Sequence, residues 1–173
     1  MMYLQSLPSM WRTELMHPLF VHFPIALVIF STLALIVVRL NLWPRYHGAI
    51  RGGGLLMLFS GVVLAWISVY SGVQADSVVG RHVCDPTVLE DHERFAFTAS
   101  YLFTAAAIIE MAGSFFRKRQ WYPAIRKFLV AGVLILHLLG AATIGYVGHL
   151  GAKLVYQQAA AVHQPSEDCS EFE

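Results

Sequence analysis

Four long apolar runs constrain the fold more than any other feature of this chain. They cover about residues 18–40, 48–73, 90–116 and 124–156, and each is long enough to cross a bilayer, which takes about 20 helical residues. Hydrophobic residues make up 57% of the 173 residues and charged residues only 13%, which is unusual for a soluble domain. The sequence therefore predicts an all-α integral membrane protein, an antiparallel bundle of four transmembrane helices forming one domain over residues 1–161.

The basic residues predict how this bundle is oriented. Most of the twelve Lys and Arg lie in the first and third connections: Arg39, Arg45, Arg51, Arg117, Lys118, Arg119, Arg126 and Lys127. Short loops rich in Lys and Arg stay in the cytoplasm. We therefore expect a bacterial inner-membrane protein with both termini periplasmic, together with the second connection and the polar tail 162–173. The first sixteen residues lack the order of a cleavable signal peptide, so the first helix is expected to direct insertion.

Histidines gather at the periplasmic end of this arrangement. His17 and His22 open the first helix, His92 opens the third and His149 lies near the end of the fourth. At 1.5 Å per residue, His22 lies roughly 25 Å from the basic end of its helix, His149 roughly 33 Å and His92 roughly 37 Å. A hydrocarbon core of about 30 Å then brings all of them near one membrane surface. Polar groups are costly in that position unless they are used.

This convergence predicts a bound haem b or metal ion. We expect His22 and His149 as the axial haem ligands, because their depths agree best among pairs from neighbouring helices, with His92 as the first substitute and His17 beside them. Copper or zinc held by His22, His92 and His149 is an alternative, and so is a hydrogen-bonded structural cluster. Three carboxylates at the same end could orient the imidazoles or could be solvated loop charges: Asp76, Asp91 and Glu93.

Small residues and the remaining polar residues complete the pattern. Glycines that could give a macrocycle room are Gly72, Gly145, Gly148 and Gly151, although ordinary membrane-helix packing explains them equally well. His137, near mid-membrane, is expected to hydrogen-bond within the bundle, and Glu110 to pair with basic residues. Cys84 and Cys169 fall on the oxidising side, which predicts a disulfide between them. No internal repeat is evident.

Several function classes find no support in the sequence. It contains no C-x-x-C-H for covalent haem attachment, no nucleophile elbow, no H-E-x-x-H and no phosphate-binding loop. It also shows no basic patch of the kind that binds nucleic acid. These observations argue against a hydrolase or a nucleotide enzyme.

Two motifs resemble a known family. The segment from His17 to Ala26, with the pattern HPxxVHFPIA, and Gly148-His149-x-Gly151 followed by Leu154-Val155-Tyr156, resemble a bacterial four-helix membrane-protein family of unknown function. The resemblance covers roughly residues 14–158, although Ala152 stands where a second glycine is expected. Relatives are sometimes joined to c-type cytochrome domains, so the resemblance implies a redox setting at the periplasmic side.

These observations together predict an electron-transfer protein rather than a stand-alone enzyme. We expect a membrane b-type cytochrome, or a subunit of a respiratory complex, that passes electrons between a quinone pool and a c-type cytochrome or another redox subunit. The alternatives are a copper- or zinc-binding membrane protein and a non-catalytic anchor subunit whose histidines are structural.

Overall fold

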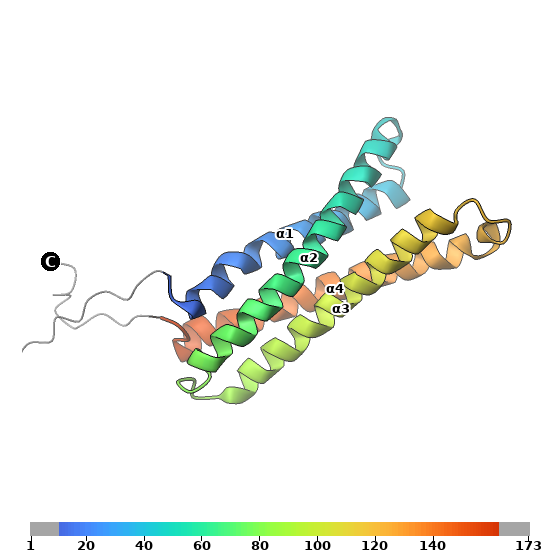
Figure 1. Ribbon diagram of the computed structural model, residues 1–173. Helices are drawn as coiled ribbons and strands as arrows, with labels where there is room; N and C mark the ends of the chain where they lie inside the picture. The colour runs from blue at the N-terminus through green and yellow to red at the C-terminus, as the bar shows by residue number, and fades with distance from the viewer. Residues whose placement is uncertain (1–10, 163–173) are drawn as a thin grey trace, which may run out of the picture.

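The protein is a bundle of four antiparallel α-helices, as a computed structural model describes it for residues 11–162 (Figure 1). The elements are α1 (Thr13–Arg39), the short 3₁₀ helix η1 (Pro44–Tyr46), α2 (His47–Val79), α3 (Pro86–Phe116) and α4 (Tyr122–Gln158). All four α-helices are long and apolar enough to span a membrane. The predicted fold class, an all-α membrane protein with four transmembrane helices, is confirmed.

Local chemistry explains where the helices begin and end. Proline stands at the first turn of α3 and α4, where its missing N–H costs nothing. Asp85 caps α3 by accepting hydrogen bonds from the Thr87 backbone N–H at 3.0 Å and from the Thr87 hydroxyl at 2.6 Å. At its other end, α2 continues to Val79, past residue 73, and closes when the Gly80 N–H donates to the Asp76 carbonyl. The longer α2 brings Asp76 onto the helix.

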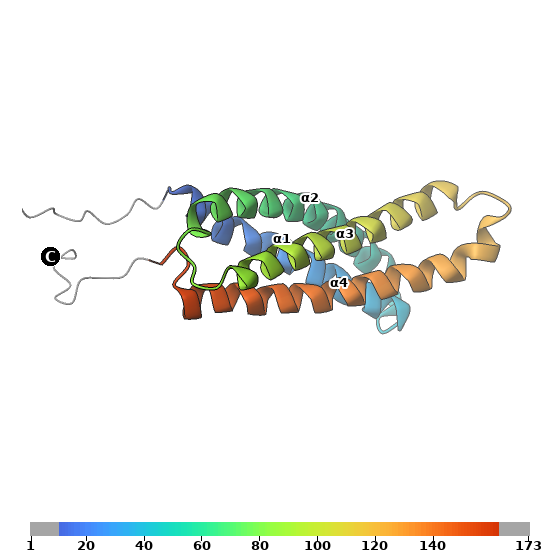
Figure 2. The ribbon, with the colours of Figure 1, turned by 90° about the horizontal axis from the view of Figure 1, so that it is seen from below.

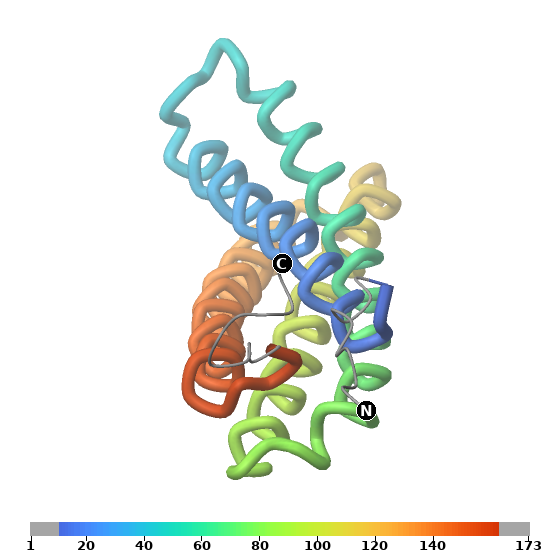
Figure 3. Tube along the Cα trace, turned by 90° about the vertical axis from the view of Figure 1, so that its left-hand side faces the viewer, coloured from blue at the N-terminus to red at the C-terminus, as the bar shows by residue number. Residues whose placement is uncertain are grey.

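The helices are arranged as two hairpins. α1 packs mainly along α2 and α3 mainly along α4, while the contacts between the two hairpins are fewer. The hairpins lie together where α1 begins and α4 ends, and they diverge toward the opposite end, as the tube in Figure 3 and the view in Figure 2 show. We call the first end the terminal end and the opposite end, which carries the basic connections, the arginine end.

The buried core lies between the hairpins and uses close contacts to glycine. Val28, Leu58, Phe103 and Ala107 form this core, one residue from each of α1 and α2 and two from α3. Glycines at positions 61 and 140 accept Val28 and Phe103: a Cβ there would lie 2.8 Å from Val28 Cγ1 and 2.7 Å from Phe103 Cε2. Such small residues let membrane helices approach each other where hydrophobicity cannot drive association.

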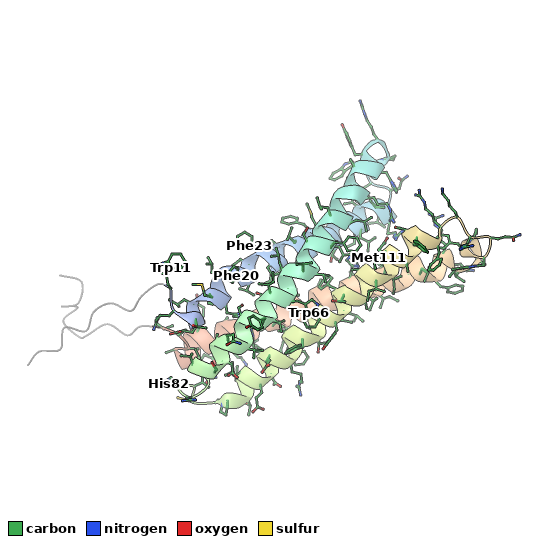
Figure 4. All side chains as sticks on the ribbon, in the orientation of Figure 1. Trp11, Phe20, Phe23, Trp66, His82 and Met111 are labelled. Carbon is green, nitrogen blue, oxygen red and sulfur yellow. The ribbon has the colours of Figure 1, made fainter. Side chains whose placement is uncertain are left out.

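Large apolar side chains cover the outside of the bundle. Phe23 on α1 and Met111 on α3 are 60% and 58% exposed, and both project away from the helices (Figure 4). In an aqueous protein, this much exposed apolar surface would be a liability, whereas lipid solvates it. Trp66 of α2 instead turns to α3, where its indole N–H donates to the Thr104 hydroxyl at 3.0 Å.

Two sequence expectations for buried polar residues are confirmed. Glu110 of α3 is an ion-pair partner of Arg51, at 2.9 Å, and of Arg39, at 3.8 Å. His137 of α4 is 2% exposed, and its Nδ1–H donates to the Val133 carbonyl at 2.9 Å. Both residues lie in the half of the bundle nearer the arginine end.

Candidate functional site

Two histidines, His17 and His92, face each other across the bundle at the terminal end. Their ring centres are 6.2 Å apart, and their ring planes are perpendicular. They come from α1 and α3, the first helix of each hairpin, which occupy diagonal positions in the bundle. The pair therefore joins the two hairpins across the interior and not along a helix–helix seam.

Each ring is held by the backbone of the second helix in its own hairpin. His17 Nδ1 lies 3.0 Å from the Ser68 carbonyl oxygen on α2, and His92 Nδ1 lies 3.1 Å from the Val147 carbonyl oxygen on α4. Because a carbonyl only accepts, Nδ1 must carry the proton in both rings. In the neutral rings Nε2 then holds a free lone pair, which is the form that binds metals.

A glycine in each hairpin gives the histidine access to that carbonyl. Gly72 follows Ser68 by four residues, and Gly151 follows Val147 by four. A Cβ at Gly72 would lie 3.1 Å from His17 Cε1, and one at Gly151 would lie 3.3 Å from the same atom of His92. Any larger residue would press on the imidazole, so these glycines serve the histidines directly.

The same contacts occur in both hairpins with the same spacing of eleven residues along each helix. They pair His17 with Gly72 and Val28 with Gly61 in the first hairpin, and His92 with Gly151 and Phe103 with Gly140 in the second. The structure thus contains an internal repeat that is not evident from the sequence alone. In this repeat, His17 and His92 hold equivalent positions in the two hairpins.

The paired rings line a cavity of about 400 Å³ between the four helices at the terminal end. Most of its wall is apolar, and its charged or titratable lining residues are Glu14, His17, His22, Asp76, His92, Glu93 and Tyr156. Its volume and its few polar groups are typical of a cofactor or small-molecule site.

Comparison with known proteins identifies the family. Residues 14–164 match the family described as "Predicted membrane protein (DUF2231)". The chain belongs to this family. No curated protein and no solved structure matches the chain.

The pair that the sequence favoured is not the pair that this family member brings together. His22 lines the cavity but is exposed, and its Nδ1 lies 2.6 Å from the Pro18 carbonyl of its own helix. His149 is exposed, stacks on Tyr146 with ring centres 6.4 Å apart, and lies outside the cavity lining. At 3.6 residues per turn, His149 points about 200° away from Gly151. Its depth in the membrane was estimated from the sequence, but its direction was not.

The predicted carboxylates divide between two environments. Asp76 and Glu93 line the cavity, whereas Asp91 is paired with Arg94 on the surface of α3 at 2.8 Å. Within residues 11–162, no three His, Cys, Asp or Glu side chains come close enough together to hold a metal ion. The three-histidine copper or zinc site is therefore not formed by His22, His92 and His149 as arranged here.

The cysteine prediction falls partly outside the described residues. Cys84 is exposed in the connection between α2 and α3, at the terminal end, and Cys169 lies outside residues 11–162. The polar tail 162–173 also lies almost entirely beyond them. A Cys84–Cys169 disulfide therefore stays a prediction.

Proposed function

We propose that this protein is a membrane b-type cytochrome, as a respiratory-complex subunit, in which His17 and His92 bind one haem b inside the terminal cavity. The observation that carries the proposal is the pair of imidazoles facing each other across the bundle. Bonds between a metal and an imidazole nitrogen are about 2 Å long, so two rings on opposite sides of one metal ion have centres about 6 Å apart. The distance of 6.2 Å between the ring centres fits that requirement.

The number of ligands favours haem over a bare metal ion. A structural zinc site takes four protein ligands and a catalytic one takes three, but His17 and His92 are only two, and no third group of that kind lies close to them in the described chain. A porphyrin supplies the remaining ligands itself, so haem needs no more than two histidines. The apolar wall of the cavity suits a macrocycle.

The residues around the pair have defined roles in this proposal. The Ser68 and Val147 carbonyls fix the tautomer and orientation of the two rings and make Nε2 more basic. Gly72 and Gly151 keep the imidazoles close to those carbonyls. Haem b, when bound, supplies a one-electron carrier. Negative charge from Asp76 and Glu93 on the cavity wall favours the oxidised, more positive state.

The partners follow from the proposed orientation in the membrane. We propose that the terminal end faces the periplasm of the inner membrane, so that electrons pass between the quinone pool and a c-type cytochrome or another periplasmic redox subunit. The basic residues of the opposite end support this orientation. A reporter that is active only in the periplasm, fused after Glu173, should be active. Activity of a cytoplasmic reporter at the same position would reverse the orientation.

Absorption spectra test the cofactor. The full-length protein, produced with ample haem, should bind one haem by pyridine haemochrome assay and show a low-spin spectrum with a sharp reduced band. His17→Ala and His92→Ala should each abolish this spectrum or make it high-spin. His149→Ala is the matched control, because it removes the same side chain at the same end outside the cavity, and its spectrum should equal that of the wild type.

Other results would redirect the proposal. Loss of the spectrum in His149→Ala but not in His17→Ala would restore the pair favoured by the sequence. Wild-type protein that contains copper or zinc but no haem would support the metal-binding alternative. Protein that contains neither would leave the role of a non-catalytic anchor subunit.

We also propose that Cys84 forms a disulfide with Cys169. Cys84 is exposed at the terminal end, where an oxidising compartment would maintain such a bond. Mass spectrometry after thiol labelling, with and without reductant, tests the bond in protein taken from its native membrane. Full labelling of both cysteines without reductant would refute it.

A further inference from the structure

A second polar group lies far from the histidine pair, in the half of the bundle nearer the arginine end. His137 is almost completely buried. Because its Nδ1–H donates to the Val133 carbonyl, Nε2 of the neutral ring is free to accept a proton. Nε2 lies 3.5 Å from the Ser31 hydroxyl on α1. An ionisable residue buried within a membrane span marks a candidate functional position.

Glu110 of α3 is a carboxylate that interacts electrostatically with this histidine. It is ion-paired with Arg51 on α2 and Arg39 on α1. From α4, Arg126 and Tyr122 interact electrostatically with Arg39. Glu110 therefore stands where charged groups from all four helices meet, on the side that leads out to the basic connections.

A small cavity connects Glu110 with His137. Its volume is about 20 Å³, and its polar lining residues are Ser31, Arg51, Glu110 and His137. A cavity of about 10–15 Å³ is sufficient for one water molecule, provided that two to four polar groups are available to bind it. Both conditions are met here. On its other side, His137 meets the edge of Phe103, with ring centres 5.7 Å apart, and the apolar core lies beyond.

The repeat between the hairpins shows that packing alone does not require these polar residues. Along α2 and α4, the repeat that matches Gly61 with Gly140 also matches Leu58 with His137. Along α1 and α3, the repeat that matches His17 with His92 also matches Leu35 with Glu110. Both leucines line the same small cavity. The first hairpin thus fills with leucine the two positions where the second hairpin carries ionisable groups.

We propose that Glu110, one water molecule in the small cavity, and His137 form a proton-transfer branch from the arginine end to the middle of the membrane. A proton from the aqueous side binds a Glu110 carboxylate oxygen. It passes to the water as that water gives one of its own protons to His137 Nε2. The O–H bond on Glu110 breaks, an N–H bond forms on His137, and the water is regenerated. The hydrogen bond from His137 Nδ1–H to Val133 stays intact, and the return path is the reverse.

Hydrogen–deuterium exchange at histidine Cε1, read by mass spectrometry, tests the branch in the full-length protein in nanodiscs. This exchange proceeds through the imidazolium, so it requires both a proton on Nε2 and water at the ring. Because His137 is buried, measurable exchange there reports the branch. His47 and His149, which are exposed, are internal controls in the same molecule. The measurement does not depend on whether haem is bound.

Two variants interrupt the branch differently. Glu110→Gln keeps the shape of the side chain but cannot carry the proton, and Ala34→Val adds methyl groups at a residue that lines the cavity. Each should slow exchange at His137 several-fold and leave His47 and His149 unchanged. Thr143→Val, which removes a hydroxyl outside the cavity, should have no effect.

Three results would overturn the proposal: no exchange at His137 in the wild type, unchanged exchange in either folded variant, or equal slowing at the control histidines. If Glu110→Gln does not fold, Ala34→Val decides alone.

Discussion

The α1–α2 hairpin and the α3–α4 hairpin share their contacts at the terminal end and differ toward the arginine end. Each hairpin places a histidine on its first helix, and on its second a glycine and the carbonyl that holds that histidine. Further along, the first hairpin has Leu35 and Leu58 where the second has Glu110 and His137. Where the hairpins agree, each contributes one histidine of the facing pair. At these two positions, only the second hairpin carries ionisable groups.

The two ends of the bundle also differ in the interactions that link the hairpins and stabilise the folded state. The helices pack mainly within each hairpin, and the hairpins diverge toward the arginine end (Figure 1). A cofactor held by one histidine from each hairpin would link them at the terminal end, and a ligand bound only by the folded state stabilises that state. At the other end, Glu110 links the hairpins through its ion pairs with Arg39 and Arg51.

The largest expected effect comes from filling the glycine beside either histidine. Gly72→Val and Gly151→Val should each reduce the haem content of purified protein severely, because a Cβ at these positions already lies 3.1 Å and 3.3 Å from the imidazoles. The displaced ring would lose its hydrogen bond to the carbonyl. Haem per protein, measured by pyridine haemochrome, checks this. A loss in only one of the two variants would show that the hairpins do not contribute equally.

Glycines with open space around them supply the controls for Gly72→Val and Gly151→Val. A Cβ at Gly132 or Gly145 would meet no atom within 4 Å. Gly145→Val and Gly132→Val should therefore retain the haem content of the wild type. If these substitutions reduce it as much as Gly72→Val does, the effect comes from helix propensity and not from the histidine contact.

The second largest effect should come from giving the second hairpin, at position 110, the leucine that the first hairpin has at the matching position 35. Glu110→Leu leaves Arg39 and Arg51 without their counter-charge and should lower the free energy of unfolding by about 3 kcal/mol. Thermal unfolding in detergent measures the loss. The surface pair of Asp91 and Arg94 supplies the control: Asp91→Ala should cost about 0.5 kcal/mol or less. Equal losses would show that Glu110 behaves as a surface charge.

Much of the fold could be predicted because it depends on features that a sequence displays directly. Apolar length gives the four spans. The position of Glu110 near clustered arginines predicts its ion pairs, and the mid-membrane position of His137 predicts a hydrogen bond within the bundle. Each of these inferences needs only the position of a residue along its helix. The structure bears them out.

The choice of the histidine pair could not be predicted in that way. Depth along a helix placed His22 and His149 together, but whether they meet depends on the direction in which each side chain points. The pairing of neighbouring helices was also assumed, whereas the two histidines that face each other, His17 and His92, lie on diagonal helices. The repeat escaped detection because its matching histidines and glycines are few, and many other matched positions hold different residues, such as Val28 and Phe103.

A smaller effect is expected in the core. Gly140→Ala and Gly61→Ala should each lower the free energy of unfolding by about 1–3 kcal/mol, the usual cost of overpacking. Their Cβ atoms would lie 2.7 Å from Phe103 and 2.8 Å from Val28. Adding Phe103→Leu should recover part of the loss in Gly140→Ala but none in Gly61→Ala. Recovery in both would mean that the two glycines do not have separate partners.

The smallest effect concerns how the two hairpins begin. α1 has no side-chain cap at Arg12, whereas Asp85 caps α3, and the hydrogen bonds from the Thr87 hydroxyl and backbone N–H lower the pKa of Asp85. A depressed pKa means that the folded state favours the carboxylate. The cap is therefore complete above the ordinary carboxyl pKa of about 3.9 and is lost as the pH falls through the lower, folded value. Amide exchange in the first turn of α3 should accelerate over that range, relative to the intrinsic rate.

Asp85→Asn tests the origin of this pH dependence. Asparagine caps helices about as well as aspartate but does not ionise, so the first turn of α3 should keep its protection at acid pH. The start of α1 should respond alike in both proteins, because no titrating side chain caps it. An equal acid-induced loss of protection at α3 in wild type and Asp85→Asn would mean that another group controls the opening of this hairpin.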